Sequence, residues 1–121
     1  MITRLCRAIS LLAGLMFSTL ALAHTGLSEA TPAADSVVAT APEHIDLVFD
    51  GPVKLIKFEL LGEGHEMPTE FKPNTESMDK FRIVTPGMHP GKFTVNWAVI
   101  GADGHTVSNS FGFTVNPANS E

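Results

Sequence analysis

Residues 91–99 read Gly91-Lys92-Phe93-Thr94-Val95-Asn96-Trp97-Ala98-Val99, and this stretch decides the fold class. From Phe93 onward a large apolar residue stands at every second position, and most residues between them are polar. Successive side chains of a β-strand point to opposite faces of a sheet. The pattern therefore predicts a strand with one face in a core and the other in water, and it lacks the apolar spacing of a helix.

Shorter alternating runs recur along the chain and are separated by turn residues. The runs are Ile45, Leu47 and Phe49; Ile56, Phe58 and Leu60; Phe81 and Ile83; and Phe111, Phe113 and Val115, with Leu27 in an opening strand. The turns are expected at 32–36, Asp50-Gly51-Pro52, Pro86-Gly87, His89-Pro90-Gly91 and Asp103-Gly104, and 62–77 reads as a long loop with a short strand at 70–72. Strands of this length and spacing predict an all-β fold, an immunoglobulin-like Greek-key sandwich or barrel of about seven strands.

The first 23 residues have the three parts of a secretory signal peptide. Arg4 and Arg7 give a positive start, an apolar run covers 9–22, and Ala21-Leu22-Ala23 fits a cleavage site. The apolar run is shorter than the ~20 residues of a membrane span, and no charged stop-transfer flank follows it. We therefore expect a signal peptide at 1–23, export, and one domain at 24–121 without a stable membrane anchor; retention as an uncleaved anchor is the alternative.

Cleavage would change the composition of the chain. The formal charge would fall from −5 to −7, because two of the eight Lys/Arg residues and none of the 13 Asp/Glu residues would leave. The single cysteine, Cys6, would leave as well, so the mature domain could form no disulfide. So acidic a domain has no basic surface for phosphates, and we expect it to attract cations and not nucleic acid.

His24 directly follows the predicted cleavage site. After cleavage it would offer a metal ion both its α-amine and a ring nitrogen, a chelate that an internal histidine cannot form. Asp103-Gly104-His105 supplies a carboxylate and a second imidazole, which can converge on one point whether the triplet is extended or forms a tight turn. Alone, the triplet is more typical of a turn in which Asp caps backbone amides.

Together, His24, Asp103 and His105 form a set of nitrogen and oxygen donors. Such a set suits Cu(II), which also heads the affinity order of the divalent ions. Zinc accepts similar ligands and stays a possibility. The set contains neither thiolate nor thioether, which disfavours Cu(I) at this site.

The chain resembles the CopC family of periplasmic copper-binding proteins over nearly all of residues 24–121. The resemblance rests on the cleavage site before His24, on Thr31-Pro32-Ala33-Ala34-Asp35, on Val84-Thr85-Pro86, on residues 91–99 leading into Asp103-Gly104-His105, and on Phe111-Gly112-Phe113-Thr114-Val115. It implies a small β-sandwich in the periplasm, copper resistance, and Cu(II) held by His24, Asp103 and His105 in a histidine brace. It also implies that the protein sequesters copper or passes it to a partner, such as an inner-membrane transporter or another periplasmic copper protein.

Some members of that family carry a second site for Cu(I) in a methionine-rich loop. Here the corresponding loop holds His65 and Met67, with Met88 and His89 further along the chain. These four residues are the candidates for a weak Cu(I) site, because thioethers select that ion. The alternative is a solvated loop histidine among methionines that fill gaps in the core. His44 is expected to be a surface histidine.

Two other functions are compatible with parts of the sequence. A histidine brace also occurs in copper monooxygenases that attack polysaccharides, but those enzymes present exposed aromatic residues, and this chain has one Trp and no Tyr. Trp97 lies in an alternating apolar run and is expected to pack in the core. A metal-free immunoglobulin-like assembly module is the second alternative. Because no catalytic set of residues stands out, we expect a binding protein and not an enzyme.

Overall fold

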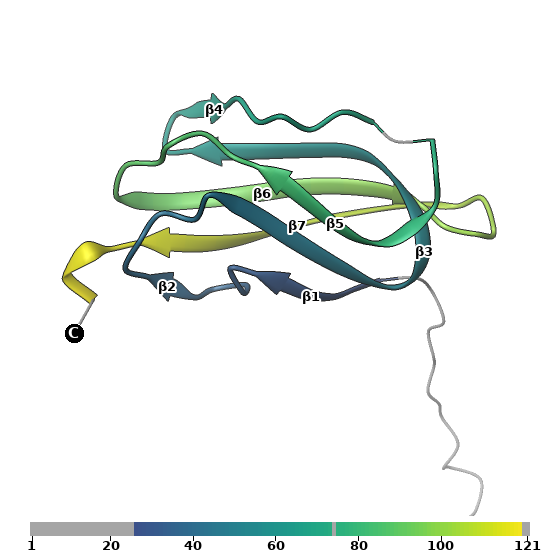
Figure 1. Ribbon diagram of the computed structural model, residues 1–121, viewed down its shortest axis with the longest axis horizontal. Coiled ribbons are helices and arrows are strands. Elements are labelled where there is room, and N and C mark those ends of the chain that lie inside the picture. Colours follow the sequence, from purple (N-terminus) through teal and green to yellow (C-terminus); the bar gives the residue numbers. More distant parts are fainter. Residues whose placement is uncertain (1–25, 74, 120–121) are drawn as a thin grey trace, which may run out of the picture.

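The computed structural model describes residues 26–73 and 75–119, and these residues form an all-β fold (Figure 1). Seven strands are present: β1 (Leu27–Thr31), β2 (Val37–Val38), β3 (His44–Gly62), β4 (His65–Met67), β5 (Met78–Val84), β6 (Gly91–Ile100) and β7 (Thr106–Val115), followed by the 3-10 turn η3 (Pro117–Asn119). The predicted all-β class and strand number are confirmed. No helix in the described part of the chain is long and apolar enough to cross a membrane.

Strand β3 belongs to both layers of the fold. Its first half pairs with β1 and β5, and its second half pairs with β4 and β6; β7 continues the second layer from β6, and β2 lies parallel to β7. Figure 1 shows β3 curving between the layers where its two halves meet. This continuous strand corrects the prediction of two strands separated by a turn at Asp50-Gly51-Pro52. Turn residues bend β3 here without ending it.

The core lies between the layers and is entirely apolar. Its largest fully buried side chains all come from β3 and β6: Phe93, Ile45, Leu47, Leu55, Leu60, Val53, Val95 and Val99. The alternation predicted for 93–99 is confirmed, since Phe93, Val95, Trp97 and Val99 are all at most 4% exposed. No polar or charged side chain is buried in the described residues. The domain is thus held together without a buried ion pair.

For the run Ile56, Phe58 and Leu60 we predicted that all three side chains point into the core, and this prediction was wrong for Ile56. A β-bulge lies between Leu55 and Lys57 in the pairing of β3 with β6, so one extra residue enters β3 there. A one-residue shift turns every following side chain to the other face. Leu55 is therefore fully buried, Ile56 is 37% exposed, and Phe58 and Leu60 point inward again.

The long loop also differs from the prediction in detail. The short strand of this region is β4 (His65–Met67), which pairs with the end of β3 through Gly62↔His65 and Leu60↔Met67. Residues 70–72, where we expected a strand, are irregular. The two-residue turn at 63–64 lets the chain fold straight back on β3, and this places His65 at the end of the molecule.

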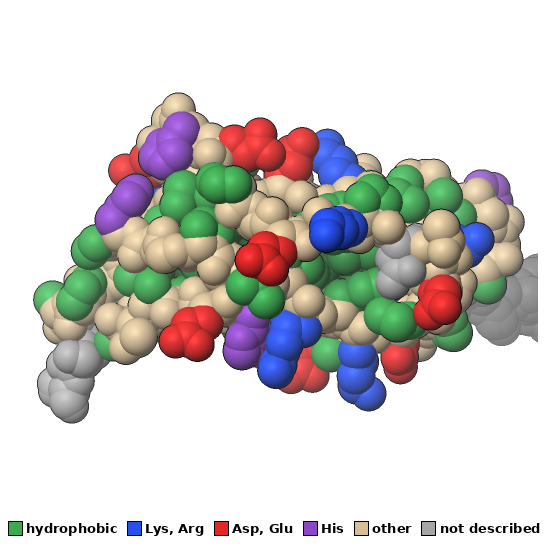
Figure 2. Space-filling model, turned by 45° about the horizontal axis from the view of Figure 1, so that its top comes forward, with side chains coloured by type: hydrophobic (Ala, Val, Ile, Leu, Met, Phe, Trp, Pro, Cys, Tyr) green, Lys and Arg blue, Asp and Glu red, His purple; other side chains and the backbone are tan. Residues whose placement is uncertain are grey.

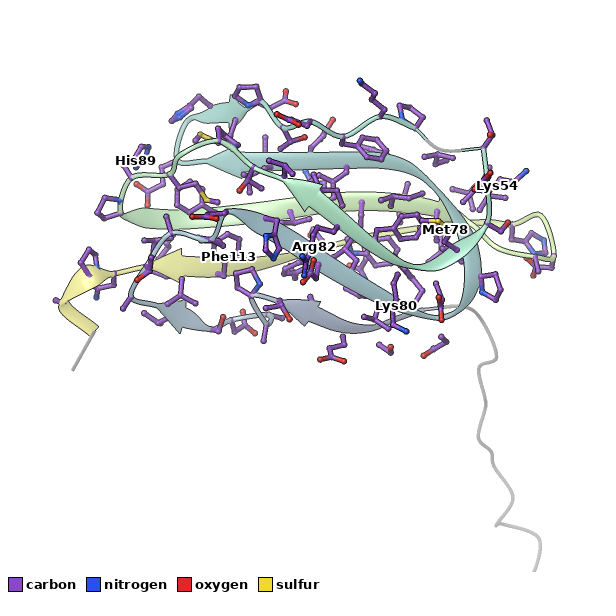
Figure 3. All side chains as sticks on the ribbon, viewed as in Figure 1. Lys54, Met78, Lys80, Arg82, His89 and Phe113 are labelled. Carbon is purple, nitrogen blue, oxygen red and sulfur yellow. The ribbon has the colours of Figure 1, made fainter. Side chains whose placement is uncertain are left out.

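Strand β6 runs the length of the molecule. Its first residue, Gly91, lies near His89 at one end, and its last residue, Ile100, pairs with Lys54 at the other. Figure 3 shows the labelled His89 and Lys54 at these opposite ends. In the space-filling view, histidine side chains likewise lie at both ends of the visible face (Figure 2).

Candidate metal centre

The connection between β6 and β7 is a tight turn that contains Asp103-Gly104-His105. The Gly101 N–H donates to the His105 carbonyl at 3.0 Å, and the Gly104 N–H donates to the Gly101 carbonyl at 2.9 Å. Gly104 has φ +86°, a left-handed conformation that glycine adopts without steric cost. Of the two conformations that the sequence allowed, the triplet adopts the turn.

Within this turn, Asp103 binds His105 through both carboxylate oxygens. Oδ1 accepts the backbone N–H of His105 at 3.0 Å, and Oδ2 lies 2.9 Å from the ring Nδ1 of the same residue. A carboxylate oxygen accepts hydrogen bonds, so Nδ1 carries the proton, and the lone pair of the neutral ring is on Nε2. This atom has no hydrogen-bond partner among the described residues. Histidines that bind metals commonly have their other nitrogen fixed in this way.

The pair is open to solvent. The side chains of His105 and Asp103 are 83% and 68% exposed. Hydrogen bonding to the Asp103 carboxylate and its negative charge raise the pKa of His105. In turn, the hydrogen bonds from the ring and backbone of His105 lower the pKa of Asp103. The turn therefore presents an oriented imidazole beside a negative charge. Because its pKa is raised, a proton competes with a metal ion for this imidazole more strongly than for an isolated one.

His24 lies outside the described residues, and the described chain begins two residues later. Gly26 is fixed beside Asp50: its carbonyl accepts the Asp50 N–H at 2.9 Å, and its N–H donates to the Asp50 carboxylate at 3.4 Å. Asp50 lies at the bend of β3, four residues before Lys54, which pairs with Ile100 just ahead of the β6–β7 turn. Figure 1 shows β1 starting from the same end of the molecule as this turn.

Asp50 is a residue whose contribution the sequence did not reveal. We expected it to make a turn, in Asp50-Gly51-Pro52, and it instead holds the start of β1. The only signal in the sequence is an Asp at the end of an apolar strand, which is equally typical of an ordinary turn.

The four candidates for a second site separate into two pairs. His65 and His89 come together, with ring centroids 5.9 Å apart. Met67 points into the core and is 8% exposed, and Met88 is a partly buried residue that packs against the core. The imidazoles are thus accessible, whereas the methionines act as packing residues in this structure.

The remaining histidine and the tryptophan have structural surroundings. His44 Nε2 lies 3.8 Å from the Asp46 carboxylate, which also binds Arg82 through two hydrogen bonds of 2.9 and 3.1 Å. Trp97 is 4% exposed and packs edge-to-face on Phe49, with centroids 5.2 Å apart. Both observations agree with the expected surface and core roles of His44 and Trp97.

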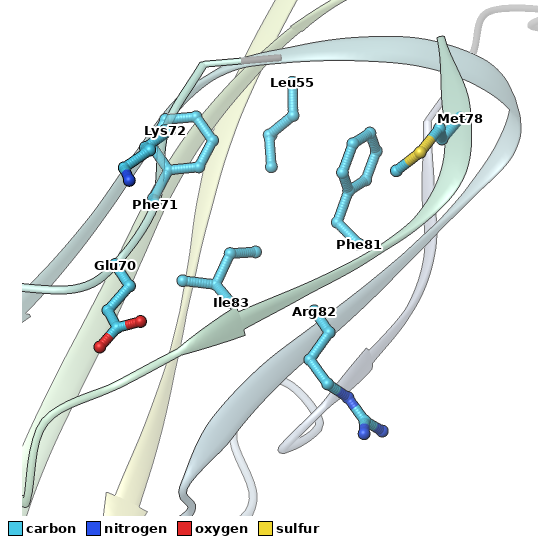
Figure 4. Close-up of a pocket in the computed structure, with 8 residues that line it drawn as sticks. All are labelled: Leu55, Glu70, Phe71, Lys72, Met78, Phe81, Arg82 and Ile83. Atoms are coloured by element: carbon cyan, nitrogen blue, oxygen red, sulfur yellow. The ribbon is translucent and has the colours of Figure 1, made fainter. Parts of the chain in front are cut away.

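No group of three or more His, Cys, Asp or Glu side chains in residues 26–73 and 75–119 is arranged to hold a metal ion. An open cavity of about 280 Å³ lies beside β5 (Figure 4), with Leu55, Phe71, Phe81 and Ile83 in its apolar lining. None of the candidate metal ligands lines this cavity. A metal site with three protein ligands at the β6–β7 turn would therefore need a ligand from outside the described residues.

Similarity to known proteins covers nearly the whole described chain, since residues 27–116 match the family model described as the CopC domain. The chain is 32% identical over 116 residues to copper resistance protein C of Escherichia coli, covering 87% of this chain and 90% of that protein. Its identity to protein YobA of Escherichia coli (strain K12) is 29% over 98 residues, covering 77% and 79%. The crystal structure of CopC from Methylosinus trichosporium OB3b is similar with a TM-score of 0.66 and 26% identity, over 81% of this chain and 99% of that chain.

Proposed function

Because the chain belongs to the CopC family of copper resistance proteins, we propose that its mature form binds Cu(II) through His24, Asp103 and His105. The family resemblance inferred from the sequence is confirmed, and with it a role in copper binding and resistance. Beyond this role we propose the identity of the ligands, the oxidation state of the copper and its binding in a histidine brace. The observation that carries it is the exposed, oriented His105 ring at the same end of the molecule as the start of β1.

The proposal requires cleavage after Ala23, with residues 1–23 removed as a signal peptide and 24–121 exported to the periplasm. An extended chain advances ~3.3–3.6 Å per residue, so a residue two positions before Gly26 is at most about 7 Å from it along the chain. Gly26 is held by Asp50 at the bend of β3. A short connection to Gly26 supports the proposal, because it would let the new N-terminus reach the end of the molecule that carries the β6–β7 turn.

The donor set fits Cu(II). His24 would supply its amine and a ring nitrogen, and His105 would supply Nε2, which makes three nitrogen ligands. Nitrogen and oxygen donors in a tetragonal arrangement are typical of Cu(II). Asp103 positions His105 through Nδ1, which lies on the opposite side of the ring from Nε2, so its carboxylate could contact the ion only by leaving Nδ1. The amine and the imidazoles must be unprotonated, so the affinity for copper should fall in acid.

The exposure of the site suits a carrier. A turn that is open to solvent can take up an ion and release it to another protein, and the net negative charge raises the local concentration of cations. We infer that the protein sequesters copper in the periplasm or passes it to an inner-membrane transporter or a periplasmic copper protein. An enzyme that acts on polysaccharides is disfavoured, because every Phe and Trp of the described residues is buried or half-buried.

Titration of the mature chain with Cu(II), followed by electron paramagnetic resonance, tests the proposal. We expect one tight equivalent with nitrogen hyperfine structure, and His105→Ala should weaken binding at least about a hundredfold, because a ligand is lost. His44→Ala is the matched control, since His44 is accessible but lies on another surface. Equal affinities of the two variants would contradict the assignment of His105.

A second titration isolates the N-terminal amine. A chain with one extra residue before His24 retains every side chain but loses the chelate of amine and ring. Intact-mass measurement first establishes the mature N-terminus of the exported protein. If the extended chain bound Cu(II) as tightly as the mature chain, the amine would not be a ligand.

A further inference from the structure

The end of the molecule opposite the β6–β7 turn carries a pair of histidine rings. His65 opens β4, and His89 lies in the connection that leads into β6. Their ring centroids are 5.9 Å apart, and the ring planes meet at 42°. Two imidazoles that bind one ion through Nε2 have centroids about 4.5–6.4 Å apart, because each nitrogen lies ~2.0–2.1 Å from the metal. The observed separation falls within this range.

Each ring is held in the form that can bind a metal. His65 Nδ1 lies 3.2 Å from the carbonyl oxygen of Glu63, and His89 Nδ1 lies 2.9 Å from that of Pro90. A carbonyl oxygen only accepts hydrogen bonds, so Nδ1 is the protonated nitrogen in both rings. The lone pair of each neutral ring is therefore on Nε2, and neither Nε2 has a hydrogen-bond partner among the described residues. A backbone carbonyl on the other nitrogen is a common support of metal-binding histidines.

The surroundings of the two rings fix their positions. The His89 ring packs on Phe93, a core residue 2% exposed, with centroids 5.7 Å apart. A Cβ at Gly62 would lie 3.5 Å from the His65 ring and 3.3 Å from the Phe93 ring, so the missing side chain leaves room for both rings. A Cβ at Gly91 would lie 3.9 Å from both His89 Nδ1 and the Glu63 carboxylate, so this negative charge lies in the neighbourhood of the His89 ring.

We propose that His65 and His89 together bind a divalent transition-metal ion through their Nε2 atoms, with water completing the coordination. Two imidazoles and water are ligands for zinc or Cu(II), whereas the thioethers that would select Cu(I) are turned into the core. This second site needs neither cleavage after Ala23 nor any contribution from the β6–β7 turn.

Zinc is the probe for the test, and the chain carries His105→Ala so that the turn contributes no imidazole. Zn(II) is added while NMR spectra of the imidazole Hε1 and Nε2 nuclei are recorded. We expect the signals of His65 and His89 to shift together and to reach a plateau at one equivalent. His89→Gln should raise the dissociation constant reported by His65 by at least about tenfold, since loss of even a residue that only supports a metal ligand costs 10–100-fold.

Two control variants distinguish one ion shared by both rings from zinc bound elsewhere or through a thioether. His44→Gln removes an accessible histidine on another surface and should leave the response of His65 and His89 unchanged. Met67→Leu conserves the buried volume and should also leave it unchanged. Independent titration of the two rings, with His65 unaffected by His89→Gln, would overturn the proposal. Loss of the site in Met67→Leu would overturn it as well, because it would make the thioether a ligand.

Discussion

Phe49 joins the two layers of the sandwich through aromatic contacts. The substitution Phe49→Leu should measure how much these contacts contribute to the free energy of unfolding. Its ring meets Phe81 of β5 at 5.9 Å and 80°, and Trp97 of β6 at 5.2 Å and 77°, both edge-to-face. Each such pair contributes about 0.5–1.5 kcal/mol beyond area burial. Leucine also fills the space of the ring less well, which adds a small packing cost to the loss of the two aromatic pairs. We therefore expect Phe49→Leu to lower the free energy of unfolding by about 2–4 kcal/mol.

Urea unfolding followed by tryptophan fluorescence provides the assay, because Trp97 is the only tryptophan in the chain and contacts Phe49 directly. With a slope of roughly 1–1.5 kcal/mol per molar urea, the midpoint should fall by about 1.3–4 M. Phe71→Leu is the control, since Phe71 is half-buried and has one tilted ring partner, Phe58, at 6.1 Å. A loss below about 1 kcal/mol, or no larger than that of Phe71→Leu, would refute the role of Phe49.

Two further predictions concern the β6–β7 turn and the bulge in β3. In the metal-free protein, NMR titration should place the pKa of His105 above 6.5, the value of an unperturbed histidine. Asp103→Asn should lower this pKa, and the same pKa of His105 with and without the substitution would contradict the ion pair. Because the pKa of His105 is raised and that of Asp103 is lowered, the pair's stabilisation should disappear both above the folded pKa of His105 and below that of Asp103. Ile56→Thr should change the free energy of unfolding by less than about 0.5 kcal/mol, whereas Leu55→Ala should lower it by about 2–5 kcal/mol. Denaturant melts measure both values, and a loss in Ile56→Thr as large as that in Leu55→Ala would place Ile56 in the core.

The strand content could be predicted from sequence because alternation is a local property. In 93–99 the choice of face follows from each residue and its neighbours, and the structure buries Phe93, Val95, Trp97 and Val99 as expected. Ile56 could not be assigned in this way. Its face depends on a bulge in the pairing of β3 with β6, and β6 lies more than 30 residues further along the chain.

The candidate metal ligands could be predicted only as far as they lie close together in the sequence. Asp103 and His105 are two residues apart, so their convergence follows from local chemistry alone. The contact between His65 and His89 depends on tertiary structure, because β4 must fold back on β3 before the two rings can meet. The position of the start of β1, which Asp50 fixes through Gly26, likewise has no local signature in the sequence.

Strand β6 also acts as a rigid spacer. Its ten residues separate the connection that holds His89 from the turn that holds His105, and at ~3.4 Å per residue this is about 30 Å. That distance is roughly four Debye lengths at physiological ionic strength. Charges gathered at the two ends would therefore repel each other very little. A protein docked over the β6–β7 turn would leave the histidine pair uncovered, so, if both ends bind ions as we propose, each could exchange its ion without blocking the other.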